Sequence, residues 1–156
     1  MINCVQINYS RSLKFKIVLF TTLLLLATTY STKAQTNDDS LKVVETIKDY
    51  VYAIYEKDTN KVYRSVHPDL AKRGYSMRDG KMVESLMSFR RLVQIAATWR
   101  TTDRKLLEPK ITVYEVLDYT ASAKLVADWG IDYFHLSKIS GEWKIYNVMW
   151  QIHPKK

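Results

Sequence analysis

The sequence contains little cysteine, glycine and proline: of its 156 residues, one is Cys, four are Gly and three are Pro. A single cysteine excludes an internal disulfide framework and a cysteine-rich zinc module. So little glycine and proline, with 47% hydrophobic residues, excludes a collagen-like, low-complexity or disordered chain. The length suits one domain. We therefore expect a single domain that an apolar core stabilises.

Acidic residues are absent from residues 1–34, which hold four basic residues and an apolar run at 17–27. A basic start, a short apolar run and a small residue (Ala34) before the cut predict a secretory signal peptide, and hence export to the periplasm or the medium. The run is shorter than the roughly 20 residues of a membrane span. We expect no stable membrane anchor after cleavage, although a retained anchor is the alternative. Cys4 precedes the run, so no lipid anchor is predicted.

Removal of residues 1–34 changes the charge. The whole chain has 24 Lys and Arg against 16 Asp and Glu, or +8. Without the four basic residues of the signal, residues 35–156 have 20 against 16, or +4, over 122 residues. The basic positions around Arg91 and 100–105 are interrupted by Asp103, which is typical of a solvated surface, so we expect no nucleic-acid partner. Residues 35–40 are polar and predict a short flexible start.

Apolar residues at spacings of three and four predict a helix of about four turns; they are Leu41, Val44, Ile47, Val51, Ile54 and Tyr55. Asp58-Thr59-Asn60 breaks this helix and can cap a short second one, which Pro68 ends. Asp79-Gly80 predicts a small hairpin turn. A third helix is predicted from near Ser85 to Trp99.

From Ile111 onward the apolar period changes to two, which is typical of strands. Turns are predicted at 118–120 and at Ser140-Gly141, and Gly130 permits a bend. Helices followed by a run of antiparallel strands indicate an α+β fold. With Ile139 opposite Glu142, the last hairpin would place three further pairs opposite each other: Lys138–Trp143, Leu136–Ile145 and Phe134–Asn147.

Three stretches resemble a known family. Residues 66–69 (Val-His-Pro-Asp) match its F-H-P-D-A-like turn, and Ala121–Leu125 matches its A-x-A-K-V strand. Residues Tyr133–Asn147 are similar to its D-Y-L-x-L-x-K-x-D-G-x-W-K-I-x-N ending. Over about residues 41–152 the chain thus resembles the putative lumazine-binding family of the NTF2-like superfamily, which includes SnoaL-like and ketosteroid-isomerase-like cones.

This resemblance implies three N-terminal helices packed on a strongly curved antiparallel sheet, with a cavity between them. It implies less about chemistry, because the superfamily includes isomerases, dehydratases, cyclases and non-catalytic scaffolds. Any function must therefore be argued from the site residues themselves.

One face of the predicted strands combines small and aromatic side chains. Alanines would leave room, and aromatic rings would stack on a flat ligand. The predicted pocket residues are Ala123, Ala127, Trp129, Asp132, Phe134, Trp143, Asn147 and Met149. In the alternative interpretation the aromatic rings fill the core and Asp132 lies in solvent. A bulge at Gly130 would move Asp132 to the other face.

Two residues are candidates for a catalytic acid or base, and two tyrosines are candidates for a hydrogen-bond donor. His67, beside a proline at a helix end, could act as an acid or base, or could simply bond a backbone group. Asp132 could act as a base if burial raised its pKa, with Tyr75 or Tyr63 as hydrogen-bond donor. The histidines are scattered and no phosphate loop is present, so we expect neither a metal nor a cofactor.

The opposite sheet face is also rich in aromatic residues, which predicts a homodimer; the predicted interface is Tyr133, His135, Tyr146, Val148 and Trp150. The leading hypothesis is an exported NTF2-like protein that binds a small apolar or aromatic molecule in its cone. An isomerase or dehydratase of the ketosteroid-isomerase type, with Asp132 or His67 as base, is the second hypothesis. A ligand-free structural or partner-binding envelope protein is the third.

Overall fold

The computed structural model describes residues 38–99 and 105–154. The predicted signal peptide, residues 1–34, lies outside them, as do 35–37 of the predicted flexible start. Residues 38–40 are helical, so the flexible start was wrong there. The elements are a long helix over residues 38–55, α2 (Thr59–Ser65), β1 (Val66–Arg78), β2 (Lys81–Met87), α3 (Phe89–Thr98), β3 (Lys110–Val116), β4 (Thr120–Ala127), β5 (Gly130–Ile139) and β6 (Glu142–Gln151).

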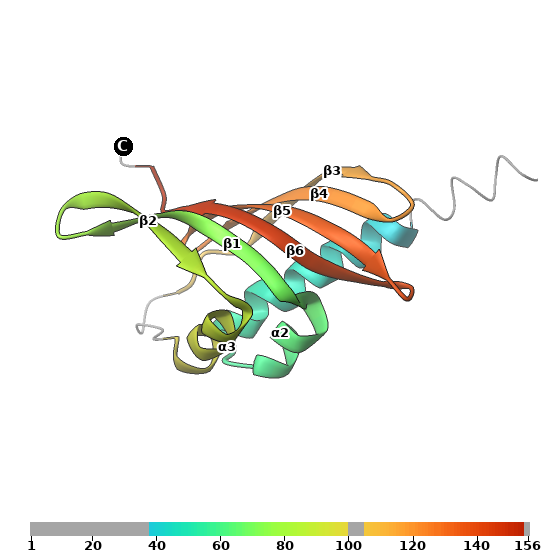
Figure 1. Cartoon of the computed structure of the whole chain (residues 1–156), viewed down its shortest axis with the longest axis horizontal. Coiled ribbons are helices and arrows are strands. Elements are labelled where there is room, and N and C mark those ends of the chain that lie inside the picture. The colour runs from blue at the N-terminus through green and yellow to red at the C-terminus, as the bar shows by residue number, and fades with distance from the viewer. Residues whose placement is uncertain (1–37, 100–104, 155–156) are drawn as a thin grey trace, which may run out of the picture. The chain divides into compact units, whose positions relative to one another are not determined.

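The six strands form one sheet in the order β2-β1-β6-β5-β4-β3. Figure 1 shows the three helices on the same face of this curved sheet. The predicted α+β architecture, with helices packed on a curved sheet, is confirmed. The pair β1–β6 is parallel, whereas the other four pairs are antiparallel. Among the described residues, no helix is long and apolar enough to cross a membrane.

The turn at Asp79-Gly80 joins β1 to β2, as predicted. The third helix begins later than predicted, because residues 81–87 pair with β1 and form a strand. Leu86 on this strand is 71% exposed. The N-cap of α3 is Ser88, whose hydroxyl accepts from the Arg91 amide at 3.2 Å.

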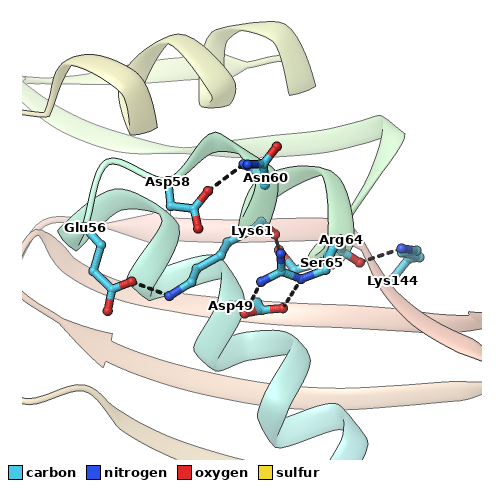
Figure 2. A network of polar contacts seen from close by, with 8 residues as sticks. All are labelled: Asp49, Glu56, Asp58, Asn60, Lys61, Arg64, Ser65 and Lys144. Carbon is cyan, nitrogen blue, oxygen red and sulfur yellow. Dashed lines mark hydrogen bonds and ion pairs between the residues drawn. The ribbon is translucent and has the colours of Figure 1, made fainter.

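Polar contacts fasten α2 to its neighbours (Figure 2). The Asp58 side chain accepts from the Asn60 amide at 2.9 Å and caps the helix, as predicted. Arg64 donates to both carboxylate oxygens of Asp49 on the long helix, at 3.1 Å each. Lys144 on β6 donates to the Arg64 carbonyl at 2.5 Å. These contacts are partly exposed, so they orient α2 more than they stabilise the fold.

The β5–β6 hairpin follows the predicted register only at its closed end. Ile139–Glu142, Lys138–Trp143 and Leu136–Ile145 are paired as predicted. Tyr146 is then an extra residue on β6, so Phe134 pairs with Val148, and the predicted Phe134–Asn147 pair was wrong. A one-residue bulge exchanges the two faces of every later position. Met149 therefore lies on the outer face, 54% exposed, and Val148 is buried at 3%.

The core lies between the long helix and the inner face of the sheet. On β4 the predicted alternation is confirmed: Ala121, Ala123, Leu125 and Ala127 are at most 6% exposed. Small side chains on this strand leave space for larger ones from its neighbours, such as Phe134 of β5, which contacts Tyr50 of the long helix edge to face. The same face continues to the open end of the hairpin, where the candidate site lies.

Candidate functional site

A pocket of about 380 Å³ opens between the long helix, α3, β1, β6 and the turn after β4. This volume is in the range of small-molecule sites. Apart from one lysine and one tyrosine, its walls are aliphatic side chains, a methionine and tryptophans. The lining residues are Tyr50, Ile54, Lys72, Met87, Leu92, Ile95, Trp99, Trp129, Trp150 and Ile152.

Trp129 is the centre of the aromatic wall. Its ring contacts Trp99 and Tyr50 edge to face, with centroids 6.1 Å apart in both pairs. The Tyr55 ring also contacts Trp129 edge to face, with ring centroids 5.8 Å apart. Edge-to-face packing holds these rings in fixed orientations. The pocket therefore presents preformed flat surfaces to a ligand.

Tyr50, Lys72, Trp129 and Asp132 form a buried polar cluster, and the first three of these residues line the pocket. Lys72 Nζ donates to the Tyr50 hydroxyl oxygen at 2.5 Å and to Asp132 Oδ1 at 3.1 Å. Tyr50 and the Trp129 indole donate to Asp132 Oδ2 at 3.1 and 3.0 Å. The Lys72 side chain is 4% exposed and that of Asp132 is 0% exposed. Two opposite charges are thus enclosed together, each with hydrogen-bond partners.

Three separate elements position this cluster. Tyr50 comes from the long helix and Asp132 from β5, where it pairs with the buried Leu125. On β1, Leu70, Lys72 and Gly74 occupy successive buried positions between exposed neighbours. Lys72 was missed in the sequence because the stretch 69–84 shows no clear strand pattern. The only signal was its alternation with Leu70.

Burial controls protonation in the cluster. It lowers the pKa of the Lys72 ammonium, against the opposing effect of Asp132. Burial also raises the pKa of Tyr50 well above its ordinary value, and the adjacent Asp132 charge adds to this shift. Tyr50 is therefore a neutral phenol at physiological pH. It can donate a proton in a hydrogen bond, but it does not act as a base.

The predicted pocket residues lie in three places. Trp129 lines the pocket and Asp132 lies behind it, bonded to Trp129 and Lys72. The side chains of Ala123, Ala127, Phe134 and Trp143 are buried in the core and do not line the pocket. Asn147 and Met149 lie on the outer face, so their assignment was wrong, because the bulge at Tyr146 exchanges the faces.

Because of the same bulge, two of the predicted interface residues were wrong. Val148 is buried in the core and Trp150 lines the pocket, so neither lies on the outer face. Tyr133, His135 and Tyr146 remain on that face. A larger depression of about 590 Å³ crosses it and is lined in part by His135 and Tyr146. Its walls lack a buried polar cluster, and we place the candidate site in the inner pocket.

The remaining catalytic candidates lie away from the pocket. Nδ1 of His67 accepts from the Asp69 amide at 3.2 Å, and its ring stacks on Tyr146 with centroids 4.1 Å apart. This is the backbone-bonding alternative considered for that histidine. Tyr75 and Tyr63 are 48% and 58% exposed, and neither lines the pocket. The structure thus brings none of these three residues together with Asp132.

The helices, the curved sheet and the pocket between them define an NTF2-like protein. An NTF2-like protein of unknown function from Silicibacter pomeroyi superposes with a TM-score of 0.64 at 16% identity, over 76% of this chain and 98% of that one. A ketosteroid isomerase-like protein from Erwinia carotovora atroseptica gives 0.51 at 14% identity, over 72% and 95%. A putative scytalone dehydratase from Novosphingobium aromaticivorans gives a TM-score of 0.55 at 13% identity, over 78% of this chain and 89% of that one.

The sequence profile of the family described as "Putative lumazine-binding" matches residues 38–151. The chain belongs to this family, and the predicted membership is confirmed. No curated protein matches the chain. The structural neighbours share the fold at low identity, so they assign no activity to this pocket.

Proposed function

We propose that this is an exported binding protein for a small, mainly apolar or aromatic molecule, which it holds in the inner pocket. The observation that carries the proposal is the preformed pocket of about 380 Å³ with three tryptophan walls. If the side chains of the protein filled this cavity, no space would remain for a ligand. Export is supported by the pattern of residues 1–34, and binding by the combination of flat apolar walls with few polar groups.

The isomerase or dehydratase alternative receives less support from the site. A base of that type needs a carboxylate or imidazole within hydrogen-bond reach of the substrate. Asp132 accepts from Lys72, Tyr50 and Trp129 and is not a lining residue. Among the described residues that line the pocket, the ionisable ones are Lys72 and Tyr50 alone. We therefore favour binding over proton abstraction.

A thermal-shift screen of residues 35–156 with flavins, pterins, steroids and fatty acids tests this proposal. We expect at least one compound to raise the melting temperature. At a hundredfold excess over Kd the stabilisation is about 2.7 kcal/mol, or of the order of 10 °C for a domain of this size.

Two variants of α3 test whether such a shift arises from the pocket. Ile95→Trp fills the pocket from a lining position and should abolish the shift. Gln94→Trp adds the same side chain at an exposed neighbouring position and should retain it. A screen without any stabilising compound would contradict the proposal, as would a shift that Ile95→Trp leaves unchanged.

We also propose that the outer sheet face forms a homodimer. Tyr133 and Met149 are direct partners across β5 and β6 and are 47% and 54% exposed, which is unusual for an apolar pair without a covering partner. Light scattering after size-exclusion chromatography should give the mass of a dimer, and Tyr133→Lys should give a monomer. A monomeric mass for the unmodified protein at all concentrations would contradict this.

A further inference from the structure

Lys72 can donate one further hydrogen bond at the pocket wall. An ammonium group has three N–H bonds, and two of them have acceptors among the described residues: the Tyr50 oxygen and Asp132 Oδ1. Nζ lies 5.3 Å from the centre of the Tyr50 ring and 5.4 Å from that of Trp150. Both rings line the pocket, as Lys72 itself does. The third N–H bond is therefore available beside a ligand.

A second donor belongs to the same wall. The indole Nε1 of Trp150 is buried and has no hydrogen-bond partner within the described part of the chain. A buried donor without an acceptor is costly, and natural proteins leave few of them. Lys72 and Trp150 thus both indicate that an occupant of the pocket supplies an acceptor atom.

The charge at the site restricts what this acceptor can be. The positive charge of Lys72 is already matched by Asp132 at 3.1 Å. Among the described residues that line the pocket, no other carries a charge. A ligand carboxylate would therefore bring an unmatched negative charge into an apolar enclosure, which is strongly unfavourable. A neutral oxygen would gain a charge-assisted hydrogen bond without that cost.

We propose that the ligand of this pocket is a flat, uncharged molecule that presents one carbonyl oxygen to Lys72 Nζ. Its body stacks against Trp99 and Trp129, its carbonyl accepts the third N–H bond of the lysine, and a second acceptor atom of the ligand pairs with Trp150 Nε1. Asp132 and Tyr50 hold the ammonium in place by hydrogen bonds, and the Asp132 charge favours its protonated form, so both act as positioning residues. This inference rests on the proposed binding function and specifies the ligand class.

Three probes of one shape test it, with binding measured by tryptophan fluorescence. Acetylnaphthalene carries the neutral carbonyl, isopropenylnaphthalene replaces it with an alkene, and naphthoate replaces it with a carboxylate. We expect acetylnaphthalene to bind roughly tenfold or more tighter than the alkene, and naphthoate to bind the weakest. The carbonyl stretching frequency of bound, isotope-labelled acetylnaphthalene should be lower than in hydrocarbon solvent, because the oxygen accepts a hydrogen bond.

The double variant Lys72→Met/Asp132→Asn removes both charges together and leaves Tyr50 and Trp129 an acceptor. In this variant the preference for acetylnaphthalene over the alkene should fall to less than about threefold, and the carbonyl frequency should return to its hydrocarbon value. Equal binding of ketone and alkene by the unmodified protein would overturn this inference and leave the binding function standing. A preference that survives in the double variant would overturn it too. If none of the three probes binds, both proposals fail for this ligand class.

Discussion

Replacing Asp132 by alanine will lower the free energy of unfolding by about 3–5 kcal/mol. The substitution leaves Lys72, 4% exposed, as an unpaired buried cation. It also removes the acceptor of the Tyr50 hydroxyl and the Trp129 indole. Urea unfolding followed by far-UV circular dichroism measures the loss. The exposed carboxylate Asp118 is the control, and Asp118→Ala should change stability by about 0.5 kcal/mol or less.

The double variant Lys72→Met/Asp132→Asn separates the loss of a charge pair from the loss of packing. It contains no unpaired charge, so it should be more stable than either Lys72→Met or Asp132→Asn alone. The resulting coupling energy is of the order of 1–3 kcal/mol in a double-mutant cycle. Additive effects of the two substitutions would contradict a direct interaction between these side chains.

Replacing Gly74 by alanine will disrupt both the sheet and the pocket. Gly74 faces Trp150 across the parallel β1–β6 pair. An added Cβ would lie 1.9 Å from the Trp150 carbonyl oxygen and 2.5 Å from its Cδ1, so the strand or the indole must move. We expect a loss of about 1–3 kcal/mol or more. Because Trp150 is a pocket wall, the ligand-induced thermal shift should also disappear.

Gly80→Ala is the matched control for Gly74→Ala. Its Cβ would meet nothing within 4 Å, but its φ of +75° is unfavourable for alanine. Gly80→Ala should therefore cost about 1 kcal/mol or somewhat more through backbone strain, and should leave ligand binding unchanged. If Gly74→Ala bound ligand as well as Gly80→Ala does, the assignment of Trp150 to the pocket wall would be wrong.

Much of the fold was predictable because its signals are local. The alanine-rich inner face of β4 follows from alternation, and the turn at Ser140-Gly141 sets the first pairs of the last hairpin. The bulge at Tyr146 has no such local signal, because one extra residue leaves the amino-acid composition of the strand essentially the same. The bulge exchanges the two faces of β6 beyond Ile145. A prediction made without it therefore places Met149 inside and Trp150 outside.

The site was less predictable than the fold. Trp129 and Asp132 could be identified from their predicted strand positions. Tyr50 and Lys72, which contact Asp132 from other elements, could not. Lysine is rarely buried, and Lys72 lies on a strand that also contains Pro68 and Gly74. On the long helix the predicted stripe included Leu41, which is 65% exposed, and omitted Tyr50, which is 1% exposed. Only tertiary packing brings these residues together.

The central claim is that a small molecule occupies the inner pocket, and the four tryptophans test it most directly. Trp99, Trp129 and Trp150 line the pocket, whereas Trp143 bonds Asp39 near the other end of β6. In a titration with the stabilising ligand, followed by the indole proton–nitrogen NMR resonances, we predict that the three pocket signals shift together and the Trp143 signal does not. Unchanged pocket signals, or a shift of Trp143 alone, would contradict the account.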